Sequence, residues 1–174
     1  LLSRSGFSVA LVEAHEPRPF DASEEVGLRV SAISPGSTAI LEQAGAWQLI
    51  DRQRNRPYRR MQVEDGVEVD SVLSDSPVLN LERLGTIVEN ALAQWSLWQV
   101  VSSNGLVDVF CPDQLDTIDF TASSNAVLLK SGKTITARLV VGADGAASRV
   151  RRAMAIRQDH YDYNQHGLVA VVAK

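Results

Sequence analysis

The stretch LVVGADGAASRVR, residues 139–151, decides the fold. It begins with an apolar run that predicts a buried strand, and it continues through Gly142, Asp144 and Gly145 into a segment ending in arginines. A strand that enters a glycine-bounded turn and then a helix presents backbone amides to a nucleotide in α/β folds. Asp144, at the carboxyl end of the predicted strand, supplies an acceptor for ligand hydroxyls. An ordinary tight connection between strand and helix fits the same pattern, so both interpretations stay open here.

The composition limits the class of protein. The chain has 174 residues, of which 45% are hydrophobic, and this suffices for one compact domain. The net charge of −4 gives no support for binding nucleic acid, which usually needs a basic patch. The single cysteine, Cys111, excludes an intrachain disulfide and a cysteine-based metal site, and it fits a reducing compartment. No metal site is expected, and the apolar runs are far shorter than a membrane span.

Both ends of the sequence read as interior parts of a larger fold. LLSRSG, residues 1–6, lacks an initiator methionine and fits the last turn of a helix that ends at Gly6. LVAVV, residues 168–172, predicts a strand whose partners are absent from this sequence. We therefore expect a fragment of a larger protein.

Strand and helix signals alternate in the first part of the chain. FSVALVE, residues 7–13, predicts a strand that ends in Glu13, and an acid at this place in Rossmann-type units accepts hydrogen bonds from a ribose hydroxyl. A solvated carboxylate fits equally well. LRVSAIS, residues 28–34, predicts an extended segment carrying Arg29, and it leads into SPGS, a helix start with a capping serine before proline. Arg29 is either solvated or placed to pair with phosphate.

A β-hairpin is predicted over residues 58–72. Asp65 and Gly66 would close it, because Asp-Gly favours the positive φ angles of a type I′ turn. An antiparallel hairpin does not belong to a parallel dinucleotide-binding sheet, so it indicates a second, sheet-containing domain. The extended residues 84–90 then lead into a tryptophan-rich helix, for which Asn90 is the predicted N-cap.

The second part of the chain predicts a β-meander. Its four strand signals lie at residues 107–112, 115–122, 126–130 and 134–141, and the last of them runs into the glycine-bounded turn at Gly142.

These motifs, in this order, resemble a known family. ARLVVGADGAASRVR, residues 137–151, is similar to the DG fingerprint of FAD-dependent aromatic hydroxylases of the p-hydroxybenzoate hydroxylase class. FSVALVE resembles the second strand of their FAD-binding domain. LRVSAIS and LGTIVENALAQWSLW, residues 84–98, resemble the branch of that class that serves ubiquinone biosynthesis. The resemblance extends over essentially the whole chain.

The resemblance implies an α/β fold in two parts. Residues 1–56 and 88–158 would belong to a Rossmann-like FAD-binding domain with a β-meander, and residues 57–87 and 159–174 would be portions of an antiparallel substrate-domain sheet. The family's first strand and GxGxxG turn would lie upstream of Glu13, outside this sequence. We therefore expect these residues alone to bind FAD poorly and to be inactive.

The resemblance also implies which residues contact FAD, and these are Glu13, Arg29, Asn90, Leu115, Gly142, Asp144 and Gly145. Glu13 would hold the adenosine ribose, and Arg29 would approach the phosphates. Asp144 would serve the ribose or the pyrophosphate, in a loop also implicated in the use of NAD(P)H. Leu115 would lie against the adenine. Asn90 stands where many relatives carry an arginine that contacts FAD. No catalytic residue is assigned.

The activity implied is hydroxylation of an aromatic ring. Family members reduce FAD with NAD(P)H and use the reduced flavin to activate O2. The ubiquinone branch implies a polyprenylated phenol or quinol as substrate, a cytoplasmic location with peripheral contact at the inner membrane, and assembly in a ubiquinone-biosynthesis complex. Two alternatives stay open: a related flavoprotein such as a halogenase or prenyl reductase, and a non-enzymatic Rossmann-like binding module.

Overall fold

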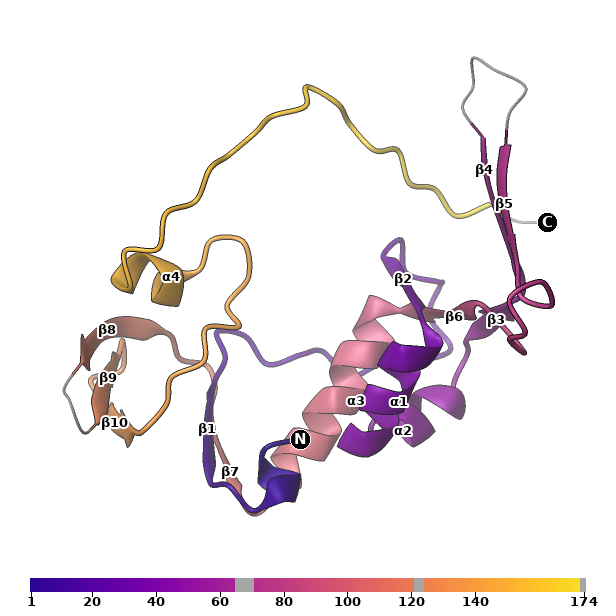
Figure 1. Ribbon diagram of the computed structural model, residues 1–174. Coiled ribbons are helices and arrows are strands. Elements are labelled where there is room, and N and C mark those ends of the chain that lie inside the picture. The colour runs from indigo at the N-terminus through magenta and orange to yellow at the C-terminus, as the bar shows by residue number, and fades with distance from the viewer. Residues whose placement is uncertain (65–70, 121–123, 173–174) are drawn as a thin grey trace. The chain divides into compact units, whose positions relative to one another are not determined.

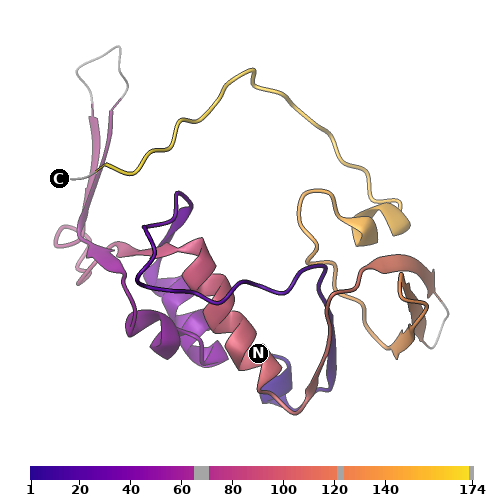
Figure 2. The same ribbon diagram turned by 180° about the vertical axis from the view of Figure 1, so that it is seen from behind.

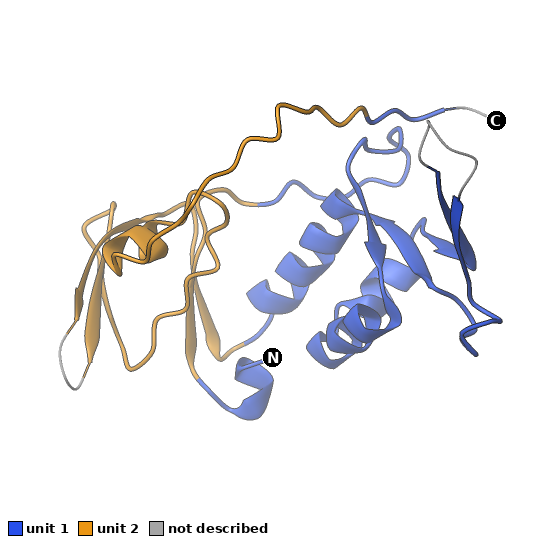
Figure 3. Ribbon diagram, turned by 45° about the horizontal axis from the view of Figure 1, so that its top comes forward, with its two compact units in different colours: residues 1–7, 17–104, 169–174 blue, residues 8–16, 105–168 orange. Residues whose placement is uncertain are grey.

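The computed structural model describes residues 1–64, 71–120 and 124–172 (Figure 1). The chain forms two compact units, which Figure 3 distinguishes by colour. Unit 1 comprises residues 1–7, 17–104 and 169–174, and unit 2 comprises residues 8–16 and 105–168.

Helices packed on a small antiparallel sheet form the core of unit 1. The helices are α1 (Pro35–Ala44), α2 (Trp47–Asp51) and α3 (Asn90–Ser102), and they lie side by side in both ribbon views (Figures 1 and 2). The three-stranded sheet has the order β2 (Val30–Ile33), β6 (Gly85–Glu89), β3 (Arg56–Tyr58). Burial of apolar surface stabilises this unit through a cluster made of Trp47, Ile50, Val88 and Leu92.

Local sequence signals set the bounds of α1, as predicted. The Ser34 hydroxyl accepts a hydrogen bond from the Ser37 N–H at 3.3 Å, and Pro35 occupies the first helical position. Gly45 ends the helix with a φ of 82°, a left-handed conformation that favours glycine. Gly6 ends the short 3₁₀ helix η1 (Ser3–Ser5) in the same way, with a φ of 84°.

The predicted helix cap at Asn90 is wrong. The N-cap of α3 is Glu89, whose backbone is extended, and Asn90 is already the first helical residue. The strand β6 runs directly into the helix, so the extended backbone at its last residue provides the transition. The Asn90 side chain instead accepts a hydrogen bond from the Ser31 hydroxyl at 2.6 Å.

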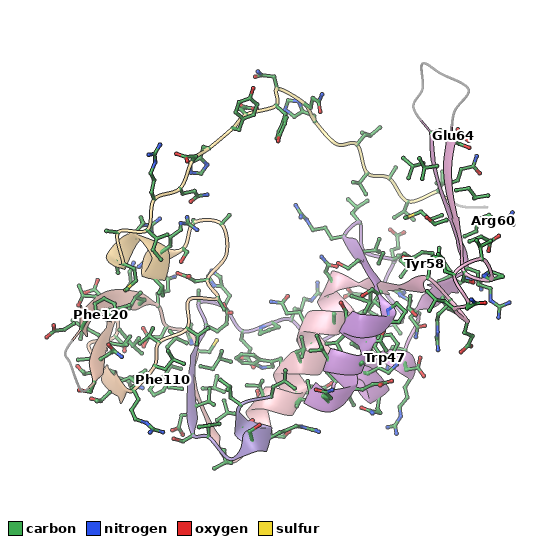
Figure 4. The ribbon with its side chains drawn as sticks, viewed as in Figure 1. Trp47, Tyr58, Arg60, Glu64, Phe110 and Phe120 are labelled. Atoms are coloured by element: carbon green, nitrogen blue, oxygen red, sulfur yellow. The ribbon has the colours of Figure 1, made fainter. Side chains whose placement is uncertain are left out.

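The predicted hairpin forms, but in another register. Strand β4 (Arg60–Glu64) pairs antiparallel with β5 (Ser71–Asp75), and Figure 4 labels Arg60 and Glu64 on it. Glu64 lies opposite Ser71, whereas a two-residue turn at Asp65 and Gly66 would place it opposite Val67. The predicted turn residues Asp65 and Gly66 lie outside the described residues. Because every residue of β4 is exposed, burial of one face does not fix the register.

Unit 2 combines a parallel strand pair with a meander. Strand β1 (Val9–Val12) pairs in parallel with β7 (Val107–Phe110). Strands β8 (Leu115–Phe120), β9 (Asn125–Leu129) and β10 (Thr134–Ala137) form an antiparallel sheet in the order β10-β9-β8. The prediction of a meander is confirmed for these three strands and wrong for residues 107–112. A parallel pair needs a long crossover, which the residues between β1 and β7 supply.

Two apolar runs that predict strands do not form them. Residues 139–141 and 168–172 have no regular secondary structure, and the side chains of Leu139 and Leu168 are 73% and 97% exposed. A strand needs a neighbour to satisfy its backbone N–H and C=O groups. Within the part of the chain that the structure describes, no strand pairs with either run.

Candidate functional site

Asp144 organises the start of α4 (Arg149–Ala153) in unit 2. Its Oδ1 accepts a hydrogen bond from the Ser148 hydroxyl at 2.5 Å, and its Oδ2 accepts from the backbone N–H groups of Arg149 and Val150 at 2.6 and 3.3 Å. The Ser148 hydroxyl in turn accepts from the Arg151 N–H at 3.0 Å. The Ser148 hydrogen bond, followed by the two backbone bonds, holds the pKa of Asp144 below its usual range. The carboxylate is therefore ionised at neutral pH and fixed in place.

A different physical constraint explains each glycine of the GxDG motif. A Cβ atom on Gly142 would lie 2.8 Å from Cβ and 2.9 Å from Cγ1 of Val150, so only glycine allows this close approach to α4. Gly145 meets open space instead, but its φ of 76° lies in the left-handed region. The pattern GxDG is thus explained by helix packing, capping and backbone conformation, before any ligand is considered.

Leu115 contributes its backbone to this arrangement. The Arg149 guanidinium donates a hydrogen bond from Nη1 to the Leu115 carbonyl at 2.8 Å and so ties α4 to the first residue of β8. The Leu115 side chain is half-buried. Its contact with an adenine ring stays a prediction.

Glu13 lies at the carboxyl end of the parallel pair β1–β7. Its N–H donates to the Phe110 carbonyl at 3.0 Å, and its own carbonyl accepts from the Asp113 N–H at 2.9 Å. Ligands of α/β sheets bind outside the carboxyl ends of parallel strands. Oε1 of Glu13 accepts the His15 N–H at 3.2 Å, and a carboxylate offers about four acceptor positions, so capacity for ligand hydroxyls remains.

Asp113 fixes the same end of the sheet, a role that no motif in the sequence predicts. Its Oδ2 accepts a hydrogen bond from the Ser131 hydroxyl at 2.5 Å, and its Oδ1 accepts from the Gln114 N–H at 2.8 Å. The hydrogen bond from Ser131 is the largest cause that lowers the pKa of Asp113. Asp113 therefore joins the end of β7 to the turn between β9 and β10. Its position beside a proline and before a strand was the only signal in the sequence.

In unit 1, the structure brings Arg29 and Asn90 together. The Asn90 N–H donates to the Arg29 carbonyl at 3.0 Å, at the junction of β6 and α3. The Arg29 residue is exposed, and within the described ranges its guanidinium forms no salt bridge. A free cation at the surface is available to an anionic ligand.

Unit 1 also contains a partly buried ion pair that no motif in the sequence predicts. Arg54 donates from Nε to Oε1 of Glu89 at 2.5 Å and from Nη2 to Oε2 at 3.1 Å, while Gly27 donates its N–H to Oε2 at 2.7 Å. The hydrogen bond between the two side chains is the largest cause that lowers the pKa of Glu89 and raises that of Arg54. The one available signal was an acid at the end of the apolar stretch GTIVE, which is almost wholly buried.

An apolar hollow of about 450 Å³ adjoins the motif in unit 2. Phe120, Leu139, Val150 and Met154 are among the residues that line it. Asn125, a polar lining residue, already donates to the carbonyls of residues 137 and 138 at 3.2 Å. Ser148 and Arg151 also line the hollow, so its lining is mostly apolar but includes a hydroxyl and a cation.

None of the helices among the described residues is long and apolar enough to cross a membrane.

Comparison with known proteins agrees with the motifs. A family model described as FAD binding domain matches residues 1–174. The 3-demethoxyubiquinol 3-hydroxylase of Escherichia coli (strain K12) is 36% identical, with 94% of this chain and 42% of that protein aligned. The human ubiquinone biosynthesis monooxygenase COQ6, mitochondrial, is 34% identical, with 94% of this chain and 37% of the relative aligned. The chain thus spans well under half the length of these curated relatives.

Solved structures show the same fold. Pseudomonas aeruginosa PqsL in complex with 2-aminobenzoylacetate superposes with a TM-score of 0.73 at 21% identity, covering 93% of this chain and 43% of that one. The p-nitrophenol 4-monooxygenase PnpA from Pseudomonas putida DLL-E4 gives a TM-score of 0.70 at 18% identity, covering 91% and 40%. The predicted fold class, an α/β flavoprotein fold with a β-meander, is confirmed.

Proposed function

Because the chain belongs to the FAD binding domain family, we propose that the complete protein is an FAD-dependent monooxygenase that hydroxylates a polyprenylated phenol or quinol in ubiquinone biosynthesis. The similarity to curated relatives named for that pathway carries the proposal. The name of the E. coli relative specifies a demethoxyubiquinol, so we assign a 2-polyprenyl-3-methyl-6-methoxy-1,4-benzoquinol as the substrate. O2 and NAD(P)H are the proposed co-substrates.

Donor and acceptor groups within each unit support FAD as the ligand. A dinucleotide presents anionic phosphates and ribose hydroxyls, which call for a cation and for hydrogen-bond acceptors. Arg29 is an exposed cation, and Glu13 follows a parallel strand with acceptor capacity to spare. Asp144 is ionised, and its three hydrogen bonds hold it in one place.

We therefore assign the phosphates to Arg29, the adenosine ribose to Glu13, and the ribose or pyrophosphate to Asp144. The remaining contacts come from the other residues of the predicted set, which are Asn90, Leu115, Gly142 and Gly145. Bound FAD, once reduced by NAD(P)H, supplies the activation of O2 that ring hydroxylation needs. The protein contributes binding and orientation.

The domain assignment is part of the same proposal. Residues 1–56 and 88–158 form the FAD-binding part, and residues 57–87 and 159–174 contribute to a substrate-domain sheet. The β4–β5 hairpin supports this, because it exposes apolar side chains such as Val72, which is 70% exposed and available to further sheet or substrate. A polyprenyl tail calls for peripheral contact at the inner membrane from the cytoplasm, and we extend the proposal to assembly with other enzymes of the pathway.

Two measurements on the complete protein test the proposed function. The purified protein should carry FAD, detected by its visible absorbance. A strain lacking the gene should lose ubiquinone and accumulate an intermediate with one ring hydroxyl fewer, detected by mass spectrometry and reversed by the gene. Unchanged quinones with bound FAD would favour a halogenase or prenyl reductase. A protein without flavin would favour a non-enzymatic binding module and refute the proposal.

A further inference from the structure

We propose that Arg54 and Glu89 form a clamp that positions Arg29 for the phosphates of the dinucleotide. This inference rests on the proposed function, because it gives Arg29 an anionic partner in FAD. Arg54 and Glu89 act as positioning residues: they touch the segment that carries Arg29, not the cofactor.

The hydrogen bonds of Arg54 show that it holds a segment of backbone. Besides its two bonds to Glu89, its Nη1 donates to the carbonyls of Ala22 and Glu24 at 2.9 and 2.5 Å, and its Nη2 donates to the Glu25 carbonyl at 3.0 Å. A guanidinium has five N–H donors in a fixed plane, and here every donor is used. No donor is left for a phosphate, so Arg54 cannot itself be the phosphate ligand in this arrangement.

Apart from the clamp, short-range contacts hold this segment: Asp21 accepts hydrogen bonds from the Ser23 N–H and hydroxyl at 2.8 and 2.7 Å, and Glu24 pairs with Arg18 at 2.5 Å. Residues 21–29 are all exposed and contain no helix or strand. Fixing an irregular backbone costs about 1–2 kcal/mol per residue in conformational entropy. Contacts with Arg54 and Glu89 offset that cost, and the Phe20 ring centroid lies 5.4 Å from Cζ of Arg54 at the start of the segment.

The backbone at Arg29 is held at the same place, the junction of β6 and α3. The Glu89 carboxylate accepts the Gly27 N–H, and the next residue, Asn90, donates its N–H to the Arg29 carbonyl. Both anchors of the segment's end therefore come from consecutive residues at the junction of β6 and α3. Displacing the Glu89 carboxylate would release Gly27, and the backbone at Arg29 would then be held by its bond to Asn90 and by the pairing of Val30 with Glu89 at the start of β2.

Burial makes the clamp sensitive to small changes. The Glu89 side chain is 7% exposed and that of Arg54 is 29% exposed. Removing one partner of such a pair leaves an uncompensated charge away from water. Lysine keeps the charge of Arg54 but offers a single nitrogen, so it cannot reach the acceptors on both sides of the planar fork.

The test is a thermodynamic cycle on FAD affinity in the complete protein. Apoprotein is titrated with FAD, and the dissociation constant is read from quenching of flavin fluorescence. Arg54→Lys and Arg29→Ala should each raise it about tenfold, as expected for a lost charge-assisted contact. The double variant should be no weaker than either single variant, because Arg54 acts through Arg29. If the two increases in the dissociation constant multiply in the double variant, the proposal is overturned.

A matched control and a second variant separate positioning from loss of folding. Arg60→Lys makes the same change in an exposed ion pair, Arg60–Asp75 at 2.8 Å, and should leave FAD affinity unchanged. If Arg54→Lys fails to fold, Glu89→Gln takes its place in the cycle, because it keeps the side-chain volume. The same non-additivity with Arg29→Ala is expected.

Limited proteolysis of the apoprotein reports on residues 21–29 directly, without the cofactor. A glutamate-specific protease should cleave apoprotein faster after Glu24 and Glu25 in Arg54→Lys, and at the wild-type rate in Arg60→Lys. Equal rates in both variants would refute the clamp. If the wild-type protein does not bind FAD, the proposed function fails and so does the assignment of Arg29. If it binds FAD and the cycle is additive, only the positioning role fails.

Discussion

Gly142 provides the sharpest test of the packing around the DG motif. Gly142→Ala would place a Cβ atom 2.8 Å from Cβ and 2.9 Å from Cγ1 of Val150. Carbon atoms in good contact are about 3.5–4.0 Å apart, so the helix must move by roughly 0.7 Å. One of the two atoms struck is the Cβ of Val150, which is fixed to the backbone. A change of rotamer therefore cannot relieve the contact.

The energetic cost of moving α4 follows from the hydrogen bonds that the movement would stretch. The start of α4 is held by the Asp144 carboxylate at 2.6 Å from the Arg149 N–H and by the Arg149 bond to the Leu115 carbonyl at 2.8 Å. Moving the helix stretches bonds that contribute about 1 kcal/mol each. Together with the overpacking itself, we expect a loss of about 1–3 kcal/mol in the free energy of unfolding.

Two other glycines serve as controls. Gly105→Ala meets open space at an ordinary φ, so stability should change by less than about 0.5 kcal/mol. Gly145→Ala also meets open space but adopts a φ of 76°, which costs about 1–2 kcal/mol in backbone strain. The assay is urea unfolding of the complete protein, with amide hydrogen exchange over residues 139–153 to localise the effect. Equal behaviour of Gly142→Ala and Gly105→Ala would refute the reasoning.

Three further predictions concern the same unit. Ser148→Ala should lower the free energy of unfolding by about 1 kcal/mol through loss of the cap, and Ser148→Thr should retain most of it, as measured by the urea midpoint. Because the pKa of Asp144 is depressed in the folded state, its stabilisation is complete above the unfolded pKa near 3.8 and is lost as pH falls through the lower folded value. Asp144→Asn should therefore flatten the acid limb of the stability curve, and an unchanged limb would contradict the cap. Glu13→Gln should weaken FAD binding several-fold in a fluorescence titration of the complete protein, whereas Glu16→Gln should not; equal effects would remove Glu13 from the ribose site.

The candidate site could be predicted in part. Gly142, Asp144 and Gly145 were recognised from their spacing, and the structure gathers them in one turn with a physical reason for each. Arg29 and Asn90 were identified separately, and a backbone hydrogen bond joins them. Their roles toward FAD stay predictions. The roles of Asp113 and of the Arg54–Glu89 pair could not be predicted, since a single charged residue in a sequence does not reveal its partner.

The sequence by itself determined the features that depend on near neighbours along the chain. Helix α1 begins at a capping serine and ends at a glycine because those interactions span only a few residues. The order of motifs likewise identified the family.

Only the tertiary structure decided which distant segments meet. It paired β7 with β1, left residues 139–141 without a strand partner among the described residues, set the register of an exposed hairpin, and joined Arg54 to Glu89 across 35 positions of sequence. Strand pairing and buried ion pairs gain their energy from groups far apart in the chain, so no local pattern can specify them.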